Sequence, residues 1–114
     1  MLIKQALFLG TLKPGQEAKM RTYVEQVLAP LWQKFTGAAR VEVLFSQTLD
    51  SKGPEIPLIL SIAYENQAKL EEAMASPARH ESRALLPAFY KTYWAKVDLA
   101  HITFEVLDPG GGHK

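Results

Sequence analysis

Arg79, His80 and Arg83 bring chemically active side chains together in one short segment of the chain. In a helix, Arg79 and Arg83 lie four residues apart on one face, and His80 lies beside that face. Arginine and histidine near a helix N-terminus can bind an anionic or oxygenated ligand. The alternative is a solvated first turn. We predict that Arg79 and Arg83 bind substrate and that His80 is a candidate acid–base residue.

A second group, His101, Thr103 and Glu105, alternates along a predicted strand. A histidine and a carboxylate on one face can act as an acid–base pair or as two metal ligands. Four residues of strand separate the two side chains by about 13 Å, so either function needs a further group, such as Glu42 or a residue of a second subunit. The alternative is a polar layer inside a dimer interface. We predict His101 as a catalytic residue and no metal site.

The third group is aromatic, and its members are predicted to line a cavity between helices and sheet: Tyr64, Tyr90, Tyr93 and Trp94. Such a cavity with a few polar anchors can bind a flat apolar ligand. Ordinary core packing is the alternative. These aromatics are therefore predicted substrate-binding residues.

Composition limits the classes of function. The 114 residues include no cysteine, which excludes disulfides and thiolate chemistry, and carry a net charge of only +1. No basic run interleaved with aromatics indicates a nucleic-acid surface, and no apolar stretch approaches the roughly 20 residues that span a bilayer. We expect a cytoplasmic protein with no nucleic-acid or membrane partner.

Apolar periodicity predicts seven elements in one domain, residues 1–108, followed by a flexible tail, residues 109–114. The predicted strands are 2–9, 40–48, 57–64 and 99–107, and the predicted helices are 16–35, 67–75 and 77–94. Pro30 should interrupt the first helix near Gln26, because proline removes a backbone donor. Ser76 and Pro77 should begin the last helix.

This βαββαβ order predicts an α+β, ferredoxin-like fold, in which a four-stranded antiparallel sheet carries its helices on one face. The first and third strands are central. We expect the helices to cover the more apolar sets of side chains: Val41, Val43, Phe45, Leu58, Leu60, Ile62, Ile102, Phe104 and Val106. The opposite face then holds Glu42, Leu44, Ser46, Ile59, Ser61, Ala63, His101, Thr103 and Glu105. Its centre is too apolar to remain in water, so we predict a homodimer joined through this face.

The element order, the long first helix and the segment Ser76-Pro77-Ala78-Arg79 before a late strand resemble the dimeric α/β barrel superfamily, and within it the small EthD-like proteins. The resemblance covers residues 2–107. It implies two sheets paired into a barrel, and it includes cofactor-free monooxygenases and small isomerases. EthD-like proteins often carry a histidine two positions before a proline in the first helix, where this chain has Leu28.

Two functions follow from the resemblance and the residues together. The first is binding or transformation of a small apolar or aromatic molecule in a helix–sheet cavity, by cofactor-independent oxygenation or proton transfer. The second is a non-catalytic dimeric stress-response or interaction module. Haem binding is a third alternative, which the histidines support little.

Overall fold

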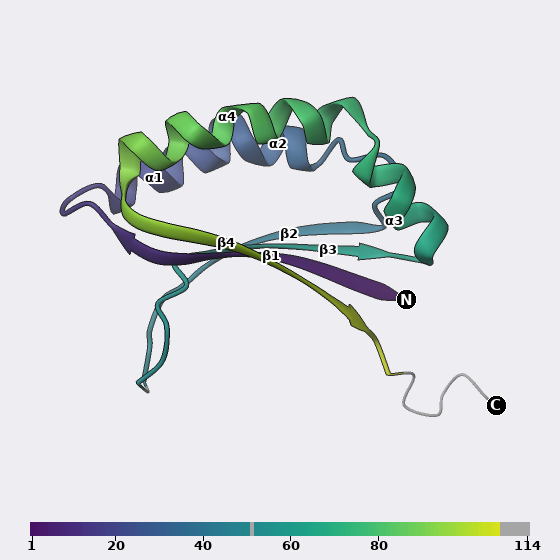
Figure 1. The fold of residues 1–114 in the computed structure, drawn as a ribbon, viewed down its shortest axis with the longest axis horizontal. Coiled ribbons are helices and arrows are strands. Elements are labelled where there is room, and N and C mark those ends of the chain that lie inside the picture. Colours follow the sequence, from purple (N-terminus) through teal and green to yellow (C-terminus); the bar gives the residue numbers. More distant parts are fainter. Residues whose placement is uncertain (51, 108–114) are drawn as a thin grey trace.

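Four antiparallel strands form one sheet in the order β2-β3-β1-β4, and all the helices lie over one of its faces (Figure 1). The computed structural model describes residues 1–50 and 52–107, so the predicted tail, residues 109–114, lies outside the described residues. The strands are β1 (Leu2–Leu12), β2 (Arg40–Phe45), β3 (Leu58–Tyr64) and β4 (Trp94–Glu105). The helices are α1 (Glu17–Tyr23), η1 (Val24–Leu28), α2 (Ala29–Trp32), α3 (Gln67–Met74) and α4 (Pro77–Tyr93).

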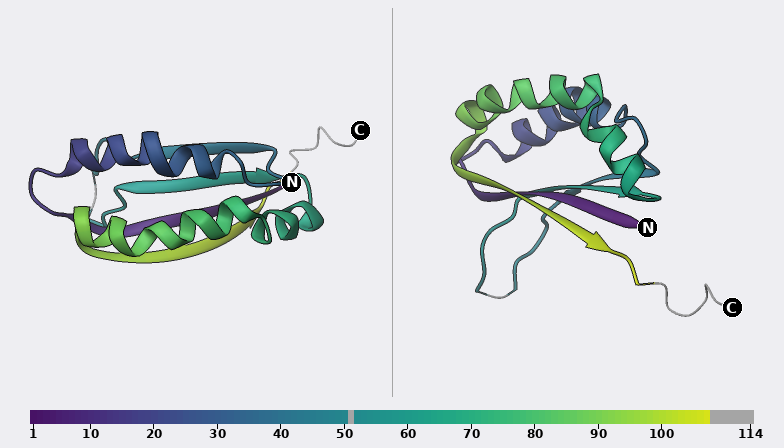
Figure 2. Two further views of the ribbon diagram at one scale, coloured as in Figure 1. Left: turned by 90° about the horizontal axis from the view of Figure 1, so that it is seen from above. Right: turned by 45° about the vertical axis from the view of Figure 1, so that its right-hand side comes forward.

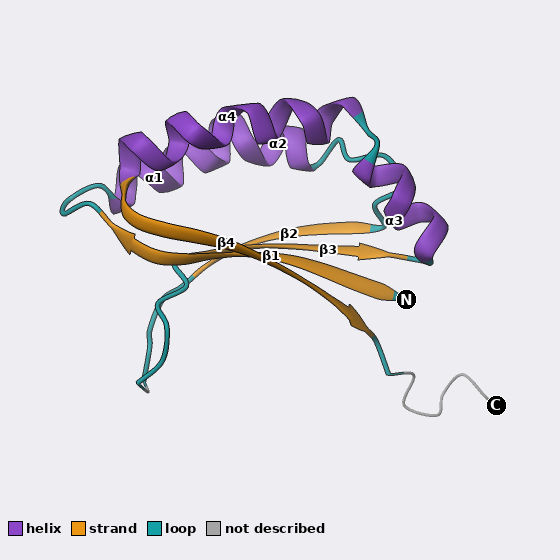
Figure 3. Cartoon of the chain, viewed as in Figure 1, coloured by secondary structure: helices purple, strands orange, loops and turns teal. Residues whose placement is uncertain are grey.

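This architecture confirms the predicted ferredoxin-like fold. β1 and β3 are the two central strands, as predicted, and the nearly continuous apolar sequence of β3 is buried along most of its length. Seen from above, α4 and the first helical segment run side by side across the sheet, and α3 lies at one end (Figure 2). The colouring by secondary structure shows the same two layers, one of helices and one of strands (Figure 3). None of the helices in the described residues is both long and apolar enough to cross a membrane.

The first helical segment changes its hydrogen-bond pattern around Gln26, which confirms the predicted interruption. Residues Val24–Leu28 form a π-helical turn, in which the Ala29 amide donates to the carbonyl of Val24, five residues earlier. Pro30 has no amide proton to continue the α-helical ladder, and a wider turn is a recognised response to such a gap. The segment therefore continues across the sheet instead of ending.

The start of α4 is fixed by its predicted cap. The Ser76 hydroxyl accepts a hydrogen bond from the Arg79 amide at 3.4 Å, and Pro77 occupies the first turn. Serine at this position satisfies an amide that the helix itself cannot pair, and proline is already in a helical backbone conformation. This cap fixes the residue at which α4 begins.

The prediction for the last strand was wrong in two respects. β4 begins at Trp94, directly after α4, and its pairing with β1 places His101 opposite Ala6 and Leu99 opposite Phe8. His101 therefore shares the helix-covered face with Ala6, whereas Ile102 and Phe104 lie on the opposite, open face.

Apolar residues were expected to face the helices because burial usually lies on that side. The helices pass over only the first part of β4, and its later part diverges from α4 (Figure 1). Ile102 and Phe104 are consequently 41% and 45% exposed. Hydrophobic alternation showed correctly that the two faces differ, but it did not show which face the helices cover.

Gly10 does not end the first strand, as its sequence position had suggested. It pairs with Val97 and has a φ of +153°, and a Cβ at this position would overlap the carbonyl oxygen of Lys96. Glycine is thus required for the close approach of β1 to β4. The contact holds the early part of β4 against the central strand and so helps to fix the register that places His101.

Candidate functional site

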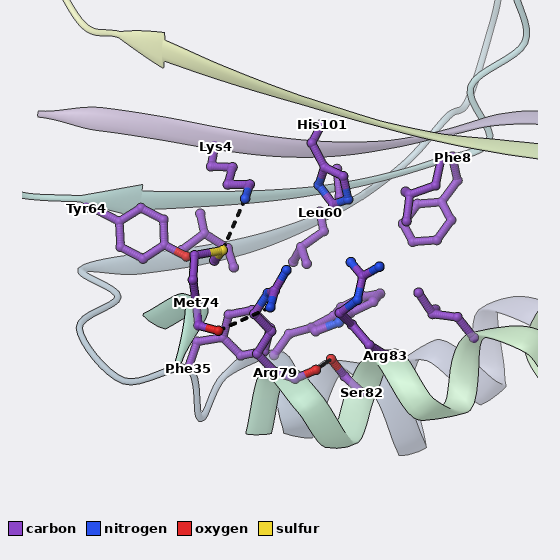
Figure 4. A pocket seen from close by; sticks show the side chains of 15 residues that line it. Lys4, Phe8, Phe35, Leu60, Tyr64, Met74, Arg79, Ser82, Arg83 and His101 are labelled. Atoms are coloured by element: carbon purple, nitrogen blue, oxygen red, sulfur yellow. Dashed lines mark hydrogen bonds between the residues drawn. The ribbon is translucent and has the colours of Figure 1, made fainter. Parts of the chain in front are cut away.

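A recess opens between the sheet and the helical layer, near the end where α4 begins (Figure 4). Its cavity volume is about 50 Å³, and about 520 Å³ of space free of protein atoms lies within the recess when its solvent-open mouth is included. Its wall is mainly apolar: Ala6, Phe8, Trp32, Phe35, Leu60, Ile62, Leu86 and Leu99. Its polar groups are Lys4, Tyr64, Arg79, Ser82, Arg83 and His101.

Three strands contribute one polar side chain each to this recess. Lys4 comes from β1, Tyr64 from β3 and His101 from β4. Alternation along β1 places Lys4 on the same face as Ala6, which is paired with His101. The register of the three strands therefore brings together residues that are far apart in the sequence.

Helix α4 contributes the opposing polar side. Arg79, Ser82 and Arg83 are spaced three and four residues apart, which places them on one helix face. The Ser82 hydroxyl donates to the Arg79 carbonyl at 2.9 Å, and Nη1 of Arg79 donates to the Met74 carbonyl at 3.1 Å. Figure 4 shows the two guanidinium groups directed from α4 toward the sheet, and Lys4 and His101 directed from the sheet toward α4.

The charges around the recess are predominantly positive. Burial lowers the pKa of Lys4, and the neighbouring charges of Arg79 and Arg83 lower it further. The Lys4 ammonium donates to the thioether sulfur of Met74 at 3.1 Å, and thioether sulfur is a weak acceptor. Lys4 therefore lies in surroundings that do little to compensate its charge.

His101 lies at the mouth, where part of its ring remains exposed. Burial lowers its pKa, and the charges of Lys4, Arg83 and Arg79 act in the same direction. A histidine with a lowered pKa is neutral at neutral pH and can accept a proton. His101 therefore has the protonation state that a general base needs.

Tyr64 is fully buried, and its hydroxyl has no hydrogen-bond partner among the described residues. Burial raises the pKa of this phenol to about 12, against a smaller opposing effect of Arg79. The hydroxyl thus stays protonated and keeps a donor available. A buried polar group without a partner is unusual in a folded protein and often marks a position where a ligand or water binds.

The structure brings four of the predicted site residues into this recess: Tyr64, Arg79, Arg83 and His101. His101 and Glu105 share one face of β4, as predicted, but it is the helix-side face, and Glu42 lies on the opposite, open face. Neither glutamate is among the residues that line the recess. Within the described residues, no three histidine, aspartate or glutamate side chains lie close enough together to hold a metal ion.

The other predicted site residues lie elsewhere. His80 is exposed on α4. Tyr90 and Trp94 pack against Phe8, with ring centroids 6.4 and 6.2 Å from it. Tyr93 contributes to a separate shallow groove on the helical surface, shared with α1.

Sequence reasoning did not predict Lys4 as a site residue. Its position two residues before Ala6 and four before Phe8, both buried under the helices, was the available signal. A lysine that shares a strand face with buried apolar residues can keep its charge hydrated only by reaching a cavity or the edge of the sheet.

A pH titration of stability tests the environment of His101. The folded pKa lies below the ordinary value of 6.5, so the unfolded chain binds a proton more readily than the folded protein. The free energy of unfolding should therefore decrease as the pH falls below about 6.5. In the variant His101→Gln this decrease should be smaller, as measured by urea unfolding at several pH values.

The matched control is His80→Gln, which removes an exposed histidine outside the recess. This variant should follow the wild-type pH dependence. If His101→Gln also follows the wild-type curve, His101 is not in the positively charged environment described above.

The open face of the sheet is a second notable surface. One row across all four strands is apolar and consists of Leu44, Ile59, Leu7 and Ala100. A second row contains Ala63, Ile3 and Phe104. Between them, Nε2 of Gln5 donates to the Ser61 hydroxyl at 3.3 Å. Leu44, Ile102 and Phe104 are each more than 40% exposed, so this face is more apolar than predicted.

The fold defines the chain as a ferredoxin-like α+β protein, and solved structures share this fold over nearly the whole length. An EthD family protein from Bacillus halodurans matches with a TM-score of 0.67 and 18% identity, over 94% of this chain and 100% of the other. A dimeric ferredoxin-like protein of unknown function from a Jannaschia species matches with a TM-score of 0.62 and 11% identity, over 93% and 100%.

A cofactor-independent oxygenase from Streptomyces nogalater matches with a TM-score of 0.57 and 14% identity, over 92% of each chain. No family model and no curated protein sequence matches the chain. At these identities the likeness establishes the fold, and it confirms the predicted resemblance to EthD-like and dimeric ferredoxin-like structures at that level.

Proposed function

We propose that the protein forms a homodimer through its open sheet faces, and that each subunit binds and transforms a small apolar or aromatic molecule in the helix–sheet recess. The observation that carries this proposal is the recess itself. It combines an apolar wall, a neutral histidine at its mouth and the unpaired hydroxyl of Tyr64. These are the features expected of a ligand site rather than of a sealed core.

The arrangement suits proton removal from a carbon acid, that is, from a carbon next to a carbonyl group. Neutral His101 would accept the proton, and the negative charge that develops on the carbonyl oxygen would be stabilised by the cations facing it. In isomerisation, His101 would then return the proton to a different carbon of the delocalised carbanion. In oxygenation, the electron pair of the carbanion would instead form a C–O bond with molecular oxygen as co-substrate, and the proton from His101 would complete a hydroperoxide. Both routes use only the side chains of the recess, the carbon acid and, for oxygenation, molecular oxygen.

Two neighbours support parts of the proposal. One is described as a cofactor-independent oxygenase and one as dimeric, and both descriptions apply to those proteins. For this chain, the dimer is further supported by the exposed apolar rows of the sheet. The loop between β2 and β3 also projects from the sheet on the side opposite the helices, where a second subunit would lie (Figure 1).

A specific observation favours the second function, a dimeric interaction module without catalysis. The cavity volume of the recess, about 50 Å³, is far smaller than that of typical ligand pockets. In the first function a ligand must therefore occupy the mouth as well as the interior. In the second, the recess is simply a hydrated gap between α4 and the diverging strand β4.

The experiment that separates the two functions measures binding and proton exchange together. Aromatic ketones and naphthols are titrated into the full chain while NMR follows both the protein amides and the exchange of ketone α-protons in D₂O. We expect shifts for residues of β1, β4 and α4 around the recess, together with accelerated exchange. His101→Gln should retain binding and lose about 10²-fold or more of the exchange rate.

His80→Gln provides the matched control and should exchange at the wild-type rate. If no compound shifts the recess residues, the ligand-binding function is wrong and the module remains. If binding occurs but His101→Gln exchanges as fast as the wild type, the acid–base assignment of His101 is wrong.

A further inference from the structure

We infer that the ligand of the recess is an organic carboxylate, with its carboxylate bound by Arg79, Arg83 and Lys4 and its apolar body against the wall near Phe8. This inference rests on the proposed ligand-binding function and specifies the class of molecule. It is carried by the charge balance, the free hydrogen-bond donors and the layout of the recess, which are independent of one another.

The charge balance of the recess is unusually one-sided. Its lining residues include three permanent or near-permanent cations and no aspartate or glutamate. The ion pairs found within residues 1–50 and 52–107 are Arg40 with Glu42 and Lys69 with Glu72, and neither lies in the recess. Every charged group that shifts the pKa of Lys4 or His101 is a cation. Partly buried charges are normally paired, so this cluster lacks a counter-ion.

The hydrogen-bond donors of the recess also exceed their acceptors. Arg79 uses one of its five N–H groups on the Met74 carbonyl, and Lys4 donates only to a thioether. No hydrogen bond from the Arg83 guanidinium or the Tyr64 hydroxyl appears among the described residues. A carboxylate has two oxygens that accept about four hydrogen bonds and contributes no donors of its own. It would therefore supply both the missing charge and the missing acceptors.

The layout of the recess indicates what is attached to the carboxylate. The cationic groups converge from α4 and from the sheet on one region, and Phe8 lies at the far end of the same recess (Figure 4). Arg83 and His101 are exposed, whereas Phe8 and Trp32 are buried. A molecule that occupies the recess therefore places its charged end near the mouth and a flat apolar part toward the aromatic wall. A planar guanidinium can bind a carboxylate through two parallel hydrogen bonds, which favours this anion over a single phenolate oxygen.

The test compares two probes that differ in charge and hardly in shape, 2-naphthoate and 2-naphthamide. Both are titrated into the full chain by calorimetry, with inorganic phosphate as a third probe. We expect naphthoate to bind at least about tenfold more tightly than the amide. The affinity for naphthoate should also rise as the pH is lowered, because protonation of His101 adds a fourth positive group. This rise should be absent in His101→Gln.

Arg83→Gln should abolish most of the preference for naphthoate while leaving the affinity for the amide unchanged. Arg83 is exposed, so this variant is expected to fold, and Arg21→Gln removes an exposed arginine of α1, outside the recess and the open sheet face, as the matched control. Equal binding of the two naphthyl probes would overturn the carboxylate inference and leave the proposed function standing. Binding of phosphate as tight as that of naphthoate would overturn the role of the apolar body. Failure of both naphthyl probes to bind would overturn the inference and count against the ligand-binding function itself.

Discussion

Replacement of Phe8 by alanine is expected to lower the free energy of unfolding by about 3–5 kcal/mol. Phe8 lies on the central strand β1 and is 1% exposed. Its ring is surrounded by four other aromatic rings, those of Trp32, Phe89, Tyr90 and Trp94, with centroids 6.2–6.4 Å away. Removal of this ring leaves a void that rigid aromatic neighbours cannot fill by small rearrangements.

Denaturant unfolding followed by tryptophan fluorescence measures this change. Phe8→Leu keeps most of the side-chain volume and serves as the control, with an expected loss of no more than about 1.5 kcal/mol. A loss below about 1 kcal/mol for Phe8→Ala would show that the aromatic cluster is not the core of the fold. Because Phe8 also lines the recess, the alanine variant should accept larger aromatic ligands than the wild type.

The order of the elements and their arrangement could be predicted from the sequence because each depends on local patterns. Residues Leu58–Tyr64 are apolar on both faces, which is typical of a central strand. Ser76 and Pro77 indicated the start of a helix through capping chemistry alone. Such signals require no knowledge of which other elements are in contact.

The orientation of β4 could not be predicted in the same way. A sheet with helices on one side and an apolar open face on the other has hydrophobic residues on both sides, so alternation cannot distinguish them. The orientation is decided by pairing with β1, where Ala6 lies opposite His101. That pairing depends on the start of β4 at Trp94 and on the irregularity between Thr11 and Leu12, neither of which has a distinctive sequence.

The site residues divide in the same way: a local pattern predicts some of them, and contacts between distant segments of the chain bring in the others. Arg79 and Arg83 were placed on one helix face by their spacing, and the structure places them together in the recess. His80 is adjacent to Arg79, but a helix turns by about 100° per residue, and its side chain is exposed to solvent. Lys4 joins the arginines only through the tertiary contact between β1 and α4, which no local pattern encodes.

The second large effect is expected at the open face of the sheet. The double variant Ile102→Glu/Phe104→Glu should convert the proposed dimer into a monomer. Both side chains are more than 40% exposed in the single subunit and lie on the face with the apolar rows. In a two-fold dimer each substituted residue occurs once in each subunit. Two changes per chain therefore introduce four carboxylates into surfaces that must exclude water.

The size of this effect follows from the cost of placing charges in an interface. If each of the four buried carboxylates costs only about 1–2 kcal/mol, the dissociation constant rises by about 10³-fold or more. Analytical ultracentrifugation over a range of micromolar concentrations measures this directly. The wild type should sediment as a dimer and the double variant as a monomer.

Thr103→Glu is the matched control, because Thr103 lies between the two positions on the other face of the same strand and is exposed. It adds a carboxylate to β4 without placing it among the apolar rows, so this variant should remain dimeric. If the wild type is monomeric, or if the double variant still dimerises, the open sheet face does not form the interface. A monomeric double variant that still binds ligand in the recess would show that dimerisation and ligand binding use opposite faces of one sheet independently.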